Sequence, residues 1–120
     1  MDANAAIVAL GAMAQTTRLE TFRLLVKHEP AGVPVGDLAR AIGVPQNTMS
    51  THLRILANAG LIVGERRSRS IVYRADLTKF QELTVFLIKD CCGGGAEFCG
   101  SLLACLPPVK PERARSRKEK

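Results

Sequence analysis

The chain has 120 residues and a net charge of +6, which suits one domain with a small core. Apolar residues make up 47% of it, whereas aromatic residues make up 4% and Trp is absent, so aliphatic side chains must fill the interior. The acidic start differs from a signal peptide, and no apolar run is long enough to span a bilayer. We therefore expect a cytoplasmic protein, with no membrane partner, whose four cysteines are reduced thiols.

The charge is distributed unevenly along the chain. Residues 110–120 carry six basic and two acidic side chains and lack apolar residues to bury. This composition is typical of a disordered basic extension. We expect residues 1–92 to form the folded domain, residues 91–106 to form a cysteine-containing segment, and residues 107–120 to form the basic tail.

Two helices are predicted before residue 30. Residues 3–14 are rich in Ala, and a thin apolar stripe suited to close helix packing consists of Ile7, Leu10 and Ala14. Thr17 and Glu20 have the spacing of a capping box, which predicts the start of the second helix. That helix ends before Pro30, and its expected core side consists of Leu19, Phe22, Leu25 and Val26.

Two amphipathic segments follow, joined by a tight turn. The first has the helical spacing i, i+3, i+4, i+7 in Val35, Leu38, Ala39 and Ile42. Gly43 stops this helix, and Pro45 suits the first turn of the next one. The second helix runs to Ala59, before Gly60, and its inward side consists of Met49, Leu53 and Leu56. Two helices separated by Gly-Val-Pro predict a helix-turn-helix.

Strand periodicity replaces helical periodicity after Gly60. Residues 61–63 and 71–73 are β-prone and flank a charged stretch, which predicts a hairpin. Glu65 is the one acidic residue near its tip, and the basic residues there are Arg66, Arg67 and Arg69, with Arg74 nearby.

A long last helix is predicted to start after Asp76, which caps it. Its apolar face consists of Leu77, Phe80, Leu83, Leu87 and Ile88. Three glycines after Cys92 remove helical preference, so the helix should end near Cys91. The predicted fold class is mainly α with a small β-hairpin, a winged helix-turn-helix.

A polar stripe lies opposite the core stripe of the second helix in the helix-turn-helix. Its amides and hydroxyls can donate to and accept from base edges, and recognition helices use their N-terminal residues for this contact. The arginine-rich hairpin suits contact with phosphate or the minor groove. We therefore predict an interface with double-stranded DNA formed by Gln46, Asn47, Thr48, Ser50, Thr51, Arg54, Arg66, Arg67 and Arg69.

This order of elements resembles the arsenical-resistance repressor (ArsR/SmtB) family of winged-helix regulators. The similarity covers residues 5–92 and is carried by residues 35–39, 49–56 and 59–62 and by the wing that ends in Tyr73. It implies a homodimer formed through the first and last helices. It also implies a repressor that binds an operator with an inverted repeat and leaves it when an inducer binds.

Three cysteines, Cys91, Cys92 and Cys99, lie within nine residues, and Cys105 follows. Adjacent cysteines fit poorly to structural zinc, which prefers thiolates with two to four residues between them. Soft trivalent arsenic prefers thiolates and can be bound by three sulfurs that lie on one side of the ion. We therefore predict an As(III) site formed by Cys91, Cys92 and Cys99, with Cys105 as a packed thiol.

The resemblance points to the same inducer. In that family, a Cys-Cys pair at the end of the last helix with a third Cys shortly after belongs to arsenite or antimonite sensors. Zinc and nickel sensors use His and carboxylate pairs on the last helix, and residues 76–90 contain no His. The sequence leaves open the choice between As(III), Sb(III) and methylarsenite.

The sequence allows one alternative function and disfavours another. A thiol-redox or persulfide sensor on the same scaffold would join two of the cysteines in a reversible disulfide. An enzyme lacks support, because the sequence has no C-x-x-C beside a βαβ pattern and no glycine-rich loop for an organic cofactor. We expect a non-enzymatic regulator without an organic cofactor.

Overall fold

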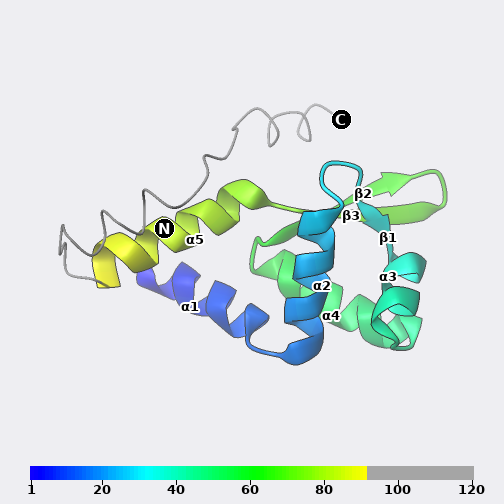
Figure 1. Ribbon diagram of the computed structural model, residues 1–120, viewed down its shortest axis with the longest axis horizontal. Helices are drawn as coiled ribbons and strands as arrows, with labels where there is room; N and C mark the ends of the chain where they lie inside the picture. Colours follow the sequence, from blue (N-terminus) through cyan, green and yellow to red (C-terminus); the bar gives the residue numbers. More distant parts are fainter. Residues whose placement is uncertain (92–120) are drawn as a thin grey trace.

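The computed structural model describes residues 1–91, and its elements follow the predicted order (Figure 1). The helices are α1 (Ala3–Met13), α2 (Thr16–Lys27), α3 (Val35–Ile42), α4 (Gln46–Asn58) and α5 (Leu77–Cys91). The strands are β1 (Val33–Pro34), β2 (Ile62–Arg67) and β3 (Ser70–Ala75). No helix in this part of the chain is long and apolar enough to cross a membrane. Most of the predicted cysteine segment and the basic tail lie outside the described residues.

Helix α1 buries a different face from the predicted one. Asp2 caps it by accepting a hydrogen bond from the Ala5 amide at 2.8 Å. The buried residues are Ala6, Ala9 and Ala12, whose small side chains allow a close approach to the rest of the protomer. Ile7 is 65% exposed and Leu10 is also exposed. The predicted stripe therefore does not pack within one chain.

Helix α2 differs from its prediction in two respects. Gln15 caps it by accepting a hydrogen bond from the Arg18 amide at 2.9 Å, so the capping box predicted at Thr17 is wrong. Phe22 and Leu25 are buried as predicted, but Leu19 and Val26 are exposed. The helix faces α4 with Thr21, whose buried hydroxyl lies 3.8 Å from the Met49 sulfur.

The helix-turn-helix formed by α3 and α4 has the predicted core. Gly43 ends α3 with a φ of +86°, a left-handed conformation that glycine adopts readily. Pro45 is the N-cap of α4, one residue before the position predicted for it. The inward side chains are fully buried, as predicted: Leu38, Met49, Leu53 and Leu56.

The predicted hairpin is part of a three-stranded antiparallel sheet with the order β1-β3-β2. Strands β2 and β3 and the turn between them are here called the wing. The strands extend further toward the charged tip than the β-prone runs did. Strand β1 was not predicted, and it pairs Val33 with Tyr73 and Pro34 with Val72. This pairing joins the segment before α3 to the wing.

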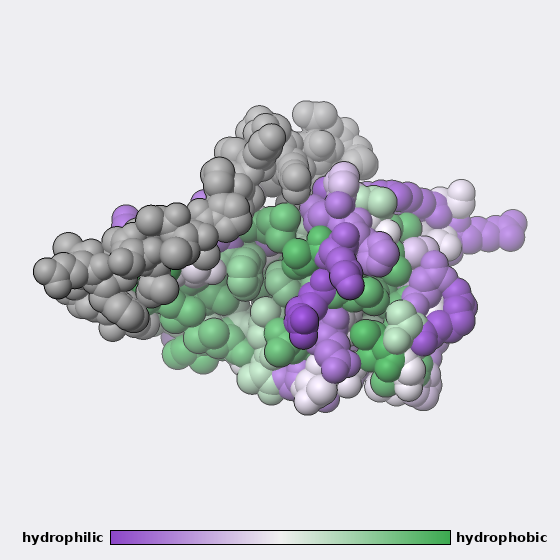
Figure 2. Space-filling view, in the orientation of Figure 1, coloured by the Kyte–Doolittle hydropathy of each residue, from purple (hydrophilic) through white to green (hydrophobic). Residues whose placement is uncertain are grey.

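Helices α1 and α5 extend from one side of the molecule, and the wing lies on the opposite side (Figure 1). Asp76 caps α5, as predicted, by accepting a hydrogen bond from the Lys79 amide at 3.1 Å. Leu83 and Ile88 are buried, and the Phe80 ring lies 5.5 Å from the Phe22 ring. Figure 2 shows apolar side chains gathered over the side formed by α1 and α5.

Two neighbouring residues of α4 test the packing of this helix. We expect Leu56→Ala to lower the free energy of unfolding by about 2–5 kcal/mol, because Leu56 is fully buried. Ile55→Ala is the matched control and should cost about 1 kcal/mol, since its side chain is 37% exposed. Urea titrations at one fixed protein concentration measure both values, and equal losses would contradict the observed orientation of α4.

Candidate nucleic-acid interface

The burial of one side of α4 leaves a continuous polar face on the other. We call this the recognition face. The six α4 residues that the sequence predicts for DNA contact are all exposed on it: Gln46, Asn47, Thr48, Ser50, Thr51 and Arg54. The helix begins here without a side-chain cap, because Pro45 at the N-cap offers no hydrogen bond. Exposed N–H groups at a helix start favour anions such as phosphate.

A groove of about 520 Å³ separates the recognition face from the wing. Its walls include Gln46 and Ser50 of α4 and Arg69 of the wing. The structure thus brings Arg69 close to two predicted residues of α4 that are distant from it in sequence. Asp37 of α3 and Tyr73 of β3 also line the groove and were not predicted as site residues. Asp37 pairs with Arg40 one turn later on α3, a spacing that indicates an ion pair on the helix surface and not a position in the groove.

The three predicted arginines of the wing tip differ in their surroundings. Arg66 and Arg69 are exposed, and neither forms an ion pair with any residue in the described part of the chain. Arg67 donates a hydrogen bond to Glu65 at 2.9 Å and another to the Ala31 carbonyl at 3.3 Å. Two tip arginines are therefore available to phosphate, whereas the third is held by the protein.

Arg74, which the sequence places near the wing tip, is buried inside the protein. Its guanidinium bonds with the Glu29 carboxylate, and this hydrogen bond is the main reason why the pKa of Arg74 is raised. Its charge is therefore paired inside the protein and not presented to solvent. Glu29 is 45 positions away along the chain, and no local sequence pattern indicates this pairing.

His52 lies on α4 beside the recognition face and contacts Arg18 of α2. The distance between Arg18 Nη1 and His52 Nδ1 is 3.3 Å, and the guanidinium can only donate, so Nδ1 is the acceptor of a neutral ring. Arg18 also donates from Nε to the Ala12 carbonyl at 2.7 Å. Burial, and then the charge of Arg18, lower the pKa of His52. This contact links the end of α1 to α4.

We expect the free energy of unfolding to depend on the protonation of His52. A histidine whose pKa is lowered on folding binds fewer protons when folded, so its stabilising contribution is complete above its ordinary pKa of 6.5. The contribution is lost as the pH falls from that value through the lowered pKa. His52→Gln keeps a neutral side chain and should show a smaller loss over this range. Urea titrations from neutral to mildly acidic pH measure the difference, and parallel profiles would contradict it.

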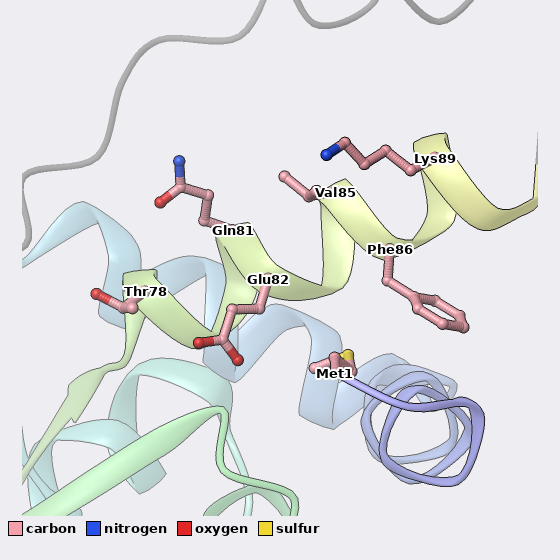
Figure 3. Close-up of a pocket in the computed structure, with 7 residues that line it drawn as sticks. All are labelled: Met1, Thr78, Gln81, Glu82, Val85, Phe86 and Lys89. Carbon is pink, nitrogen blue, oxygen red and sulfur yellow. The ribbon is translucent and has the colours of Figure 1, made fainter. Parts of the chain in front are cut away.

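The described residues do not test the predicted arsenic site. Cys91 is the last residue of α5, and Cys92, Cys99 and Cys105 lie outside the described residues. Within the described part, no group of three or more His, Cys, Asp or Glu side chains is placed to hold a metal ion. A pocket of about 450 Å³ lies between Met1 and α5 (Figure 3), where Glu82, Phe86 and Lys89 contribute to its lining. These groups offer a mixed polar and apolar surface without a thiolate or imidazole.

A helix-turn-helix with an exposed polar second helix and an arginine-tipped wing defines the class of winged helix-turn-helix domains. Comparison with known proteins agrees with this class. Residues 13–65 match the family model of a helix-turn-helix domain. The transcriptional regulator NmtR of Mycobacterium tuberculosis is 38% identical over 73 residues, which cover 61% of this chain and 61% of NmtR. The aligned region thus spans about three fifths of that relative.

Solved structures show the same architecture. An ArsR-like transcriptional regulator from Rhodococcus sp. RHA1 superimposes with a TM-score of 0.66 at 25% identity, covering 84% of this chain and 89% of that one. The homodimeric winged helix-turn-helix domain of Mb0332 from Mycobacterium bovis has a TM-score of 0.61 at 22% identity, with 71% and 77% covered. The chain is thus similar to winged helix-turn-helix transcriptional regulators, among them an ArsR-like one.

Proposed function

We propose that this chain is a homodimeric repressor that binds operator DNA and is released when trivalent arsenic binds Cys91, Cys92 and Cys99. The observation that carries the DNA-binding part is the position of the recognition face beside the wing. Hydrogen-bonding side chains from α4 and an exposed arginine from the wing line one groove, which supports contact with both bases and phosphates.

The exposed apolar residues on α1 and α5 support the homodimer. Ile7, Val8 and Leu10 of α1 and Phe80 of α5 remain accessible in one protomer. A contiguous apolar patch on a small protein marks an association surface, and the same face on two copies can cover itself around a twofold axis. Figure 2 shows apolar side chains over the side of the molecule away from the wing. Mb0332, which shares the fold, is a homodimer.

Substitutions on the two parts of the interface should have different effects on DNA binding. Arg66→Ala should weaken binding to specific and unrelated duplexes by similar factors and lower the salt slope by about 0.9, because one phosphate contact is lost. Gln46→Ala and Thr48→Ala should mainly reduce the preference for the specific duplex, by about 1–3 kcal/mol. Fluorescence anisotropy with a duplex from upstream of the gene and a scrambled duplex measures both effects. Unchanged preference in both α4 variants would show that the bases are read elsewhere.

The chemistry of the cysteine segment supports arsenic as the inducer. Adjacent residues of a helix diverge by about 100°, so the Cys91 and Cys92 sulfurs could not easily share one ion if both residues were helical. Binding arsenic would favour an unwound last turn, and residues 93–95, three glycines, lower the cost of unwinding. Because α5 carries part of the proposed dimer face, this change would alter the spacing of the two recognition faces. A coupling of about 1–3 kcal/mol between the two sites is ordinary for such a linkage.

Single cysteine variants test the inducer site. We expect Cys91→Ser, Cys92→Ser and Cys99→Ser to bind DNA but to lose release by arsenite, whereas Cys105→Ser should respond almost normally. The measurement is anisotropy of a preformed DNA complex during titration with arsenite, and separately with antimonite, methylarsenite and zinc. Release by zinc at a lower concentration than arsenite would overturn the arsenic assignment. Release by an oxidant with loss of two thiols, but not by arsenite, would favour the thiol-redox alternative.

A further inference from the structure

Arg74 of β3 connects the wing to the turn that follows α2. Its Nε donates to Glu29 Oε1 at 2.9 Å, and its Nη2 donates to Glu29 Oε2 at 3.3 Å. On the other side, its Nη1 donates to Glu65 Oε2 of β2 at 3.4 Å. One guanidinium is therefore shared between a carboxylate of the α2–β1 turn and a carboxylate of the wing.

These charges are withdrawn from solvent. The side chains of Arg74, Glu29 and Glu65 are 8%, 6% and 11% exposed. A planar guanidinium with a bidentate carboxylate partner fixes the orientation of both groups. Removing one partner of such a buried pair leaves an uncompensated charge, which is strongly unfavourable. A rotation of the wing that breaks the cluster is therefore disfavoured.

Packing of the backbone in the same place reinforces the cluster. Gly32 has a φ of +83°, and a Cβ atom there would lie 2.7 Å from Val72 Cγ1 and 2.8 Å from Arg74 Cγ. The turn thus presses directly against β3. Strand β1 adds antiparallel pairing to Tyr73 and Val72 immediately afterwards. The root of the wing is held by backbone contact and by charge.

The second oxygen of the Glu65 carboxylate extends the cluster to the wing tip. Glu65 Oε1 accepts a hydrogen bond from Arg67 Nη2 at 2.9 Å, and Arg67 Nη1 donates to the Ala31 carbonyl at 3.3 Å. The Arg67 side chain remains 50% exposed but bridges β2 to the α2–β1 turn. We refer to Glu29, Glu65, Arg67 and Arg74 together as the wing cluster.

We propose that the wing cluster positions the wing for DNA binding, with Glu29, Glu65 and Arg74 as positioning residues. Within it, Arg67 holds the wing, and Arg66 and Arg69 provide the phosphate contacts. The proposal rests on the proposed DNA-binding function and assigns distinct roles to three arginines that the sequence presents as equivalent. It also assigns a favourable role in DNA binding to an acidic residue next to the wing tip.

Neutralising Glu65 distinguishes a role in positioning the wing from a purely repulsive effect of its charge on DNA. If Glu65 acted only through its charge, Glu65→Gln would remove repulsion toward phosphate and strengthen DNA binding. The wing cluster predicts the opposite, a loss of about tenfold on specific and scrambled duplexes, which is the scale of losing the wing's phosphate contacts. Glu20→Gln is the matched control, because Glu20 is exposed on α2 and carries the same charge. It should leave the affinity nearly unchanged.

The salt dependence of DNA affinity distinguishes the arginines that contact phosphate from the arginine that holds the wing. Arg66→Ala and Arg69→Ala should each lower the slope of log affinity against log salt by about 0.9, because each releases fewer counterions. Arg67→Ala should lower the slope by more than either of them, because a displaced wing loses the phosphate contacts of both Arg66 and Arg69. Anisotropy titrations with the upstream duplex over a range of salt concentrations measure the slopes. Tighter binding by Glu65→Gln, or a slope for Arg67→Ala equal to that of Arg66→Ala, would overturn the proposal.

Hydrogen exchange of the protein without DNA tests the wing cluster independently of the proposed DNA-binding function. Hydrogen exchange of the β2 and β3 amides should be faster in Glu29→Gln than in Glu20→Gln, while the amides of α4 stay equally protected. If the parent failed to bind any duplex, the proposed function would fail, and exchange would still report on the cluster. Equal exchange of the wing in both variants would show that the cluster does not hold it. Loss of α4 protection in Glu29→Gln would show that the cluster supports the whole fold and would contradict a role specific to the wing.

Discussion

The orientation of α4 is set by the burial of Met49, Leu53 and Leu56, whose side chains are inaccessible to solvent. Each such side chain contributes about 1.5–3 kcal/mol through the apolar area it removes from water, so rotation of the helix about its axis would forfeit several kilocalories per mole. A period of 3.6 residues then leaves the opposite side of α4 outward. The neighbouring helices adapt to this constraint, since α2 places a small threonine, Thr21, against Met49. The exposed polar face is thus a consequence of the core.

The wing depends on a different kind of interaction. Its two strands carry few buried apolar side chains near the tip, and its root is held by β1 pairing and by the buried charges of Glu29, Glu65 and Arg74. Apolar packing therefore orients the recognition face, while charge and backbone pairing orient the wing. Together they define the width of the groove that Gln46, Ser50 and Arg69 line. Two surfaces that are distant in sequence can in this way face one DNA duplex.

Local pattern predicted the elements because their signals lie within single helices and hairpins. The apolar spacing of α3 and α4, Gly43 and the Asp76 cap each act over a few residues, and the structure confirms all of them. The winged helix-turn-helix class followed from the same patterns and is also confirmed, and the comparisons agree with the family resemblance. Apart from the capping box expected at Thr17, the errors concern relations between elements. Strand β1 has two residues and exists through its partner β3, Arg74 is paired with a residue 45 positions away, and the choice of α1 face depends on neighbours. The cysteine site stays a prediction, since most of it lies beyond the described residues.

The outward side of α4 and the wing tip are the proposed contacts with DNA. The most direct measurement is the amide chemical-shift change of the isotope-labelled full chain during titration with the upstream duplex and, separately, with a scrambled duplex. The account predicts that the upstream duplex shifts amides of residues 46–51 in a way that the scrambled duplex does not reproduce. Amides of Arg66 and Arg69 should shift with both. Changes confined to α5, with residues 46–51 unaffected by either duplex, would contradict it.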